Sequence, residues 1–187
     1  CPYSDVDVVL VAGPGARHTS ELAEQCWYPL WDAGVTLGHR VGSAKELVRL
    51  ANDDVDTLTA LLDGRLIAGD ASIADDCFVR IRTLAQRRRD KLVHALTLGY
   101  QARAASALIP EMLDPDLKRG GGGLRDIHAL RWVGWSLDPV GGLDALTQFG
   151  YLTDPEHAAM LLASNEITSL PDDVRAELGA GHRELYA

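Results

Sequence analysis

The two segments of this sequence that favour β-strands both lie within the first 41 residues, which limits the sheet that the chain can build. Residues 6–11 form a β-branched run that Gly13-Pro14-Gly15 ends in a turn, and residues 35–41 alternate well enough for a second strand. Most of the later sequence has helical spacing. We therefore predict an α+β fold, in which part of a small sheet precedes a mostly helical region.

Capping residues and apolar spacing locate the first helices. A helix over residues 18–31 is expected to be interrupted by Pro29, because proline has no backbone N–H to donate. Ser43 is a candidate N-cap for a helix to about residue 50, and Asp53 or Asp54 for the next one. The apolar residues of that next helix are expected to be Leu58, Leu61, Leu62, Leu66 and Ile67.

A single long helix is predicted over residues 73–108, with Gly99 as the candidate position for a break. Residues 110–123 form the clearest irregular stretch of the sequence. Shorter helices are expected after it, over residues 126–135, 144–149 and 155–163.

Charge is unevenly distributed along the chain. The 187 residues have a net charge of −9, yet residues 77–140 hold 11 Lys and Arg against 6 Asp and Glu. The net acidity argues against a nucleic-acid partner, because binding a polyanion needs clustered cations. Three cysteines without CxxC spacing favour a reducing compartment, so we expect the cytoplasm. No apolar run reaches the roughly 18 to 20 residues of a membrane span, so no membrane partner is expected.

The first candidate site is the acidic pair at the start of the predicted strand. Asp5 and Asp7 share one face of a strand, since alternate side chains point to the same side. Two neighbouring carboxylates repel each other unless a cation neutralises them, and Mg²⁺ bound with substrate phosphate would do so. The alternative is a pair of solvated surface aspartates, which are common in turns.

The second candidate is the glycine-rich segment of residues 118–127. Gly120 to Gly123 precede a predicted helix, so their backbone N–H groups and the helix N-terminus could face an anion, with Lys118 and Arg125 on either side. The segment lacks the GxxxxGK[ST] pattern of a P-loop. A flexible connection between domains explains the glycines equally well.

The third candidate is a basic stretch that could attract a triphosphate or an acidic partner. A charge run on a helix is more often a solvated face, and that alternative is favoured on the residues alone. The cations of this stretch are Arg80, Arg82, Arg87, Arg88, Arg89 and Lys91.

Together these segments resemble a known family. Tyr3-Ser4-Asp5-Val6-Asp7 and the strand after it resemble the metal-binding motif of the DNA polymerase β-like nucleotidyltransferases. Residues 30–41, then Asp54 with residues 61–70, and then residues 118–127 resemble, in order, the bifunctional uridylyltransferase/uridylyl-removing enzymes that modify the PII nitrogen-signalling protein. The core of the last block is Gly122-Gly123-Leu124-Arg125-Asp126-Ile127.

This resemblance implies a transfer of UMP from UTP to a tyrosine of PII, with release of pyrophosphate and a requirement for Mg²⁺ or Mn²⁺. Asp5 and Asp7 would be the catalytic, metal-binding residues. Contacts to the nucleotide would come from Lys118, Gly122, Gly123 and Arg125. Residues 1–72 would be a partial nucleotidyltransferase domain, and residues 73–187 a helical domain associated with it.

The sequence departs from the family pattern in ways that carry further expectations. The Gly-Ser loop that holds the phosphates in this family is expected upstream of Cys1, so we expect the chain to be a fragment that is inactive or nearly so by itself. The third carboxylate of the superfamily is not evident where Gly38-His39-Arg40 stands, and Asp54 and Asp63 are weak substitutes.

Three other functions remain open at this point. An adenylyltransferase that acts on glutamine synthetase would share the acidic pair and the glycine segment. A non-catalytic nucleotide-sensing module would bind nucleotide without needing Asp5 or Asp7. A helical interaction domain would use the basic stretch of residues 80–91 to bind an acidic partner in a salt-sensitive way.

Overall fold

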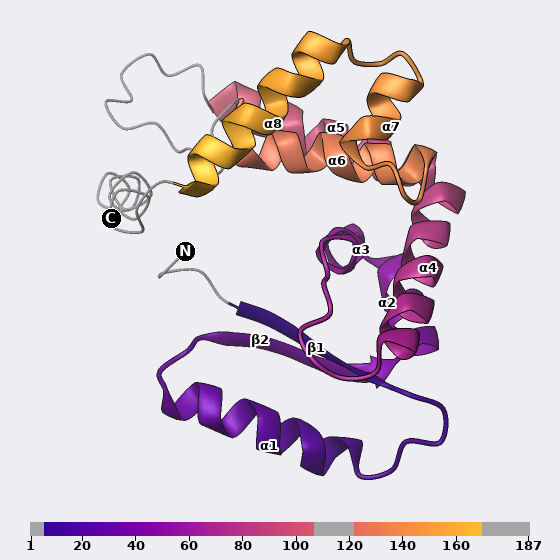
Figure 1. Cartoon of the computed structure of the whole chain (residues 1–187), viewed down its shortest axis with the longest axis vertical. Helices are drawn as coiled ribbons and strands as arrows, with labels where there is room; N and C mark the ends of the chain where they lie inside the picture. The colour runs from indigo at the N-terminus through magenta and orange to yellow at the C-terminus, as the bar shows by residue number, and fades with distance from the viewer. Residues whose placement is uncertain (1–5, 107–121, 170–187) are drawn as a thin grey trace. The chain divides into compact units, whose positions relative to one another are not determined.

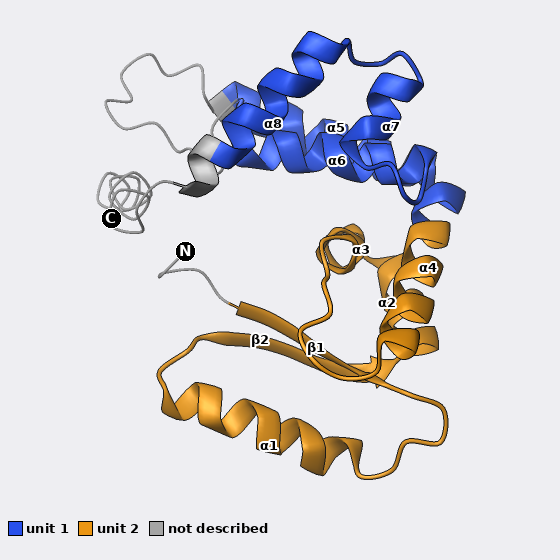
Figure 2. Ribbon diagram, in the orientation of Figure 1, with its two compact units in different colours: residues 1–2, 85–187 blue, residues 3–84 orange. Residues whose placement is uncertain are grey.

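The structure of the chain is a computed structural model that describes residues 6–106 and 122–169 (Figure 1). It divides into two compact units, one of residues 3–84 and one of residues 1–2 and 85–187 (Figure 2). Each unit is described by itself below. The predicted domain border between residues 72 and 73 stays a prediction.

The unit of residues 3–84, orange in Figure 2, is built on a two-stranded parallel sheet. Strands β1 (Val6–Ala12) and β2 (Leu37–Ser43) pair from Val6 with Leu37 to Ala12 with Ser43. Helix α1 (Thr19–Asp32) connects them, as a parallel pair requires. The unit continues with helices α2 (Ala44–Asp53) and α3 (Val55–Leu62) and most of α4 (Ala71–Arg87). A small sheet followed by helices confirms the predicted α+β class.

The two faces of this sheet have different neighbours. Figure 1 shows α1 along one side of the strands and α3 on the other. On the α1 side, the His39 ring lies 5.9 Å from the ring of Trp27 and 5.3 Å from that of Trp31, between ring centroids. Trp27 is buried, so this ring contact belongs to the packing of α1 on the sheet.

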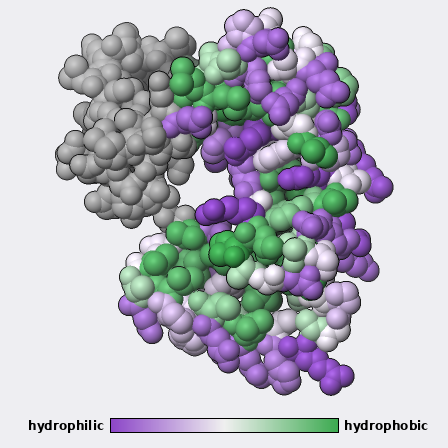
Figure 3. Space-filling model, in the orientation of Figure 1, coloured by the Kyte–Doolittle hydropathy of each residue, from purple (hydrophilic) through white to green (hydrophobic). Residues whose placement is uncertain are grey.

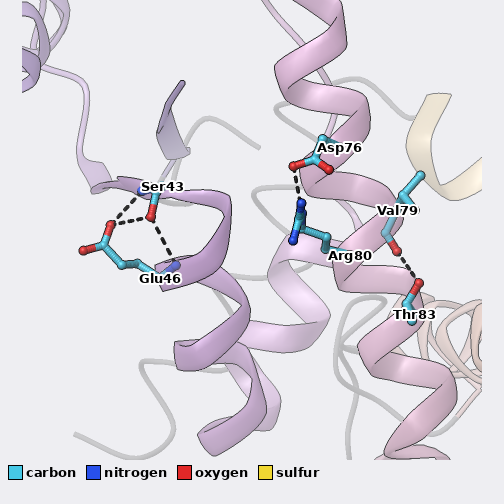
Figure 4. A network of polar contacts seen from close by, with 6 residues as sticks. All are labelled: Ser43, Glu46, Asp76, Val79, Arg80 and Thr83. Carbon is cyan, nitrogen blue, oxygen red and sulfur yellow. Dashed lines mark hydrogen bonds and ion pairs between the residues drawn. The ribbon is translucent and has the colours of Figure 1, made fainter. Parts of the chain in front are cut away.

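The predicted N-caps of α2 and α3 are confirmed. The Ser43 hydroxyl oxygen accepts the backbone N–H of Glu46 at 3.3 Å, and the Glu46 carboxylate accepts the backbone N–H of Ser43 at 2.8 Å (Figure 4). Asp54 accepts the backbone N–H of Thr57 at 2.8 Å. Caps of this kind satisfy N–H groups that have no partner within the helix.

Two predicted boundaries in the unit of residues 3–84 are wrong, each for a local reason. Helix α1 passes through Pro29 and ends at Asp32, because the proline removes only one donor while its own carbonyl still accepts the backbone N–H of Ala33. Strand β2 begins at Leu37 rather than residue 35, because the backbone N–H of Val35 donates to the carbonyl of Leu30 where α1 ends.

The predicted apolar face of the third helix is also too long. Helix α3 ends at Leu62, and the side chains of Leu66 and Ile67 lie beyond it, exposed by 44% and 75%. The core of the unit is formed by Leu47, Ala51, Leu58, Leu62, Ala74, Cys77 and Ile81.

The long helix predicted over residues 73–108 is two helices, α4 and α5 (Arg89–Ser106). The break falls at Arg88 and not at the predicted Gly99, which lies inside α5. After the break, the carbonyl of Arg88 accepts the backbone N–H of Leu92 at 2.9 Å at the start of α5, and the Arg89 Nε donates to the carbonyl of Ser136 at 3.1 Å. The second bond satisfies a carbonyl at the end of another helix of the same unit.

The unit of residues 85–187, blue in Figure 2, contains α5, α6 (Leu124–Leu137), α7 (Leu143–Gln148) and α8 (Asp154–Ser169). Its core joins α6 and α7 through Ile127, Leu143 and Leu146. Large hydrophobic side chains are also exposed on both units, and Figure 3 shows such residues between hydrophilic ones. Of the helices in the two described ranges, none has the length and apolar character needed to cross a bilayer.

Candidate functional site

Asp7 lies near the start of β1, with an exposed side chain. Its partner across the sheet is Gly38, and a Cβ added to Gly38 would collide with the Asp7 carboxylate. The carboxylate therefore occupies the space above the neighbouring strand that a larger residue would fill. Asp5, the other residue of the predicted pair, lies outside the described residues.

The register defines which residues share a face with Asp7. Paired residues of parallel strands point to the same side, so Asp7 and Val9 share a face with Gly38 and Arg40. This is the face opposite His39, which contacts the tryptophans of α1. This face carries one carboxylate and one guanidinium beside the apolar Val9 and Val11.

Asp54, a weak substitute for the third carboxylate, already serves as a helix cap. The pKa of its carboxyl lies below the ordinary value, because the hydroxyl and then the backbone N–H of Thr57 donate to it. The positive charge of Arg40 adds to this lowering. Asp63, the other substitute, is the C-cap of α3.

Metal binding at Asp7 would depend on donors beyond the described part of the chain or on the substrate. Residues 6–106 and 122–169 hold no group of three His, Cys, Asp or Glu side chains that could bind a metal ion. The oxygen donor of Asp7 nevertheless has the chemistry that Mg²⁺ prefers, and the ion commonly takes one or two carboxylates together with phosphate and water.

The end of the glycine-rich segment is tied to two helices. The backbone N–H of Gly122 donates to Asp126 at 2.8 Å, and the buried Gly123 is the N-cap of α6. Asp126 also forms an ion pair with Arg103 of α5, whose side chain is 21% exposed against 15% for Asp126. The Gly122 donor is thus used by the first turn of α6. Lys118 lies outside the described residues.

Arg125 lies beside Asp126, and its side chain is exposed. Its guanidinium carbon lies 5.8 Å from the ring centroid of Trp132, two turns further along α6. Trp132 is only 4% exposed and also contacts His128, at 6.0 Å between ring centroids. A buried aromatic ring therefore supports Arg125 while leaving its charge at the surface.

The basic stretch of residues 80–91 does not lie on one helix. Arg80 forms an ion pair with Asp76 at 2.8 Å on the exposed side of α4 (Figure 4), and Arg89 donates to Ser136. An open pocket is lined by residues 86–91, at the junction of α4 and α5. Part of this stretch therefore has structural roles that its charge pattern did not indicate.

The described site residues belong to different units. Asp7 is in the unit of residues 3–84, and Gly122, Gly123 and Arg125 are in the unit of residues 85–187. Sequence reasoning missed the ion pair of Arg103 with Asp126, because no local pattern links residues 23 positions apart.

The second half of the chain matches the sequence model of a known family. The model of the GlnD PII-uridylyltransferase family matches residues 91–176.

Curated relatives extend the similarity over most of the chain. A bifunctional uridylyltransferase/uridylyl-removing enzyme of Novosphingobium aromaticivorans is 34% identical over 88% of this chain and 18% of its own length. Enzymes with the same name from Streptomyces coelicolor and Mycobacterium tuberculosis are 33% and 29% identical, over 95% and 97% of this chain and 22% and 24% of their own lengths.

The chain therefore spans about a fifth of the length of these relatives. No solved structure matches the chain significantly. The family model and the relatives agree with the family that the motifs resembled. The chain belongs to the GlnD PII-uridylyltransferase family.

Proposed function

We propose that the chain is part of a nucleotidyltransferase that moves UMP from UTP to a tyrosine of the PII protein. The observation that carries this proposal is the similarity, over 88% of the chain, to a relative named as a uridylyltransferase/uridylyl-removing enzyme. The relatives' names favour a uridylyl over an adenylyl group, which separates this proposal from the glutamine synthetase alternative.

In the proposed reaction the tyrosine oxygen attacks the α-phosphorus of UTP. A bond forms between them, the bond from that phosphorus to the oxygen bridging to the β-phosphorus breaks, and pyrophosphate leaves with that oxygen. The phenolic proton passes to solvent or to a base. The substrate carries several negative charges, so catalysis depends mainly on positioning and on nearby positive charge.

The residues of this chain supply both requirements. Asp7, with Asp5, would hold Mg²⁺ or Mn²⁺, and the ion would neutralise phosphate charge when bound. The resemblance assigns nucleotide contacts to Lys118, Gly122, Gly123 and Arg125, and among these Arg125 offers an exposed guanidinium that rests on Trp132. In the cytoplasm, where we expect the protein, both UTP and PII would be accessible to it.

The test combines binding with transfer. Titration calorimetry of the chain with UTP and ATP, each with Mg²⁺, is expected to show preferential binding of UTP. Asp7→Asn is expected to remove the Mg²⁺-dependent part of this binding, whereas Asp32→Asn at the exposed end of α1 leaves it unchanged. Binding of neither nucleotide, or a preference for ATP, would contradict the proposal.

Transfer of label from [α-³²P]UTP to purified PII then measures what the isolated chain can do. We expect little or no transfer, because the chain spans only about a fifth of the length of the relatives that are named for this activity. Turnover close to that of a complete relative would show that this expectation is wrong, while supporting the proposed reaction.

A further inference from the structure

Arg40 is the one residue on the Asp7 face of β2 that carries a charge. It pairs with Val9, two residues beyond Asp7, so its side chain leaves the sheet on the same side as the Asp7 carboxylate. From the strand spacing and the rise per residue, the Cα atoms of Asp7 and Arg40 are about 8 Å apart. The neighbouring His39 points to the other face, where it contacts Trp27 and Trp31.

The guanidinium of Arg40 is available for a ligand. Arg40 is exposed, and within the described ranges no hydrogen bond or ion pair engages its side chain. Arg40 lowers the pKa of Asp54 through its charge, while the Asp54 carboxylate accepts the hydroxyl of Thr57 at 2.5 Å. Among the described residues, Arg40 therefore acts on Asp54 only through its charge, and none of them accepts its five N–H donors.

The position of this cation suits an anion and not a metal ion. A guanidinium cannot ligate a metal, and it repels a second cation beside Asp7. It matches phosphate oxygens well, because it can donate two parallel hydrogen bonds to one phosphate group. A polyphosphate whose first phosphate is held at Asp7 through a bound cation could place its later phosphates toward Arg40, because the two Cα atoms are about 8 Å apart.

We propose that Arg40 binds the two terminal phosphates of the nucleotide, which leave as pyrophosphate. This inference rests on the proposed function, since it takes Asp7 as the place of the reacting phosphate. It assigns Arg40 a role that a carboxylate at this position of β2 could not fill. Arg40 would hold the leaving group through ionic hydrogen bonds, whereas UMP without those phosphates would not need it.

The experiment compares ligands that differ only in these phosphates. Titration calorimetry of the whole chain with UTP, UMP and inorganic pyrophosphate is carried out for the unmodified chain, Arg40→Gln, Arg40→Lys and Arg49→Gln. Arg49 is the matched control, because it is also exposed and lies on α2 of the same unit. Circular dichroism and the thermal midpoint show whether each variant keeps its fold.

Arg40→Gln is expected to weaken the binding of UTP and of pyrophosphate about tenfold or more, since one charge-assisted contact is lost. UMP binding should change less than about twofold, and Arg40→Lys should recover part of the affinity because it keeps the charge. Arg49→Gln should resemble the unmodified chain.

Unchanged pyrophosphate binding by a folded Arg40→Gln variant would overturn the inference, and so would an equal loss of UMP and UTP binding. These results are distinct from a failure of the proposed function. If UTP binds, and Asp7→Asn weakens it while Arg40→Gln does not, only the role of Arg40 is wrong. If the unmodified chain binds neither UTP nor UMP, both proposals are wrong.

Discussion

The carboxylate of Asp7 lies over Gly38, its partner on the adjacent parallel strand, in the space that a Cβ of residue 38 would need. Gly38 has no positive φ, so its backbone does not require glycine. The reason for glycine here is the close approach of the Asp7 side chain. The proposed metal-binding carboxylate is thus positioned by a residue that has no functional group.

Gly38→Ala is therefore expected to displace the Asp7 carboxylate and weaken binding of Mn²⁺ about tenfold, as loss of a supporting residue around a metal ligand typically does. Mn²⁺ binding is measured by electron paramagnetic resonance. Gly42→Ala is the matched control, because it lies on the same face of β2 and its added Cβ would meet no atom closer than 3.6 Å. Equal Mn²⁺ affinity in the two variants would contradict this role of Gly38.

Asp126→Asn is expected to lower the free energy of unfolding by about 2 kcal/mol, because it leaves the largely buried guanidinium of Arg103 without its countercharge. Urea unfolding measures the change. The comparison is Asp76→Asn, which breaks the exposed ion pair with Arg80 and should have a much smaller effect. Similar effects in both variants would mean that the Arg103 pair contributes no more than a surface pair.

The local signals in the sequence predicted the local structure well. Ser43 was predicted as an N-cap, and Asp53 or Asp54 as the next, because a cap depends on a side chain and a backbone N–H three residues later; Asp54 is the one that caps α3. The strands and the α+β class followed from β-branched composition near the start of the chain. Pro29 misled the prediction, because a proline weakens or kinks a helix without always ending it.

The features that form the site depend on contacts that no local pattern encodes. The register that places Asp7 over Gly38 and Arg40 beyond it arises only when the two strands pair. The ion pair of Arg103 and Asp126 likewise joins two helices. No glycine or proline marks the helix break at Arg88, whereas the glycine at position 99 lies inside α5 and does not break it.

Gly134→Ala tests the packing of α6. A Cβ on Gly134 would collide with the backbone carbonyl of Gly142, in the turn before α7, so the turn or the helix must shift. We expect a loss of about 1 to 3 kcal/mol in the free energy of unfolding, as for other overpacked sites. In an exposed helix interior the same change stabilises by roughly 1 kcal/mol. An unfolding midpoint in urea that stays the same or rises would therefore contradict this contact.

The capping box of α2 makes stability depend on pH in a defined direction. The pKa of Glu46 lies below its ordinary value, because the backbone N–H and then the hydroxyl of Ser43 donate to its carboxylate. A carboxyl with a lower pKa in the folded state stabilises the fold above its unfolded pKa of about 4.3. This stabilisation is lost as the pH falls through the lower, folded value.

Glu46→Gln should keep the shape of the cap but remove this dependence, so the variant loses less stability than the unmodified chain between about pH 5 and pH 3. Urea unfolding at several pH values measures how the free energy of unfolding changes with pH in the variant and in the unmodified chain. Glu24→Gln, at an exposed position of α1, controls for the loss of one negative charge and should follow the slope of the unmodified chain. If Glu46→Gln follows that slope too, the carboxylate contributes to the cap only as a hydrogen-bond acceptor, and its ionisation adds nothing to the stability of the fold.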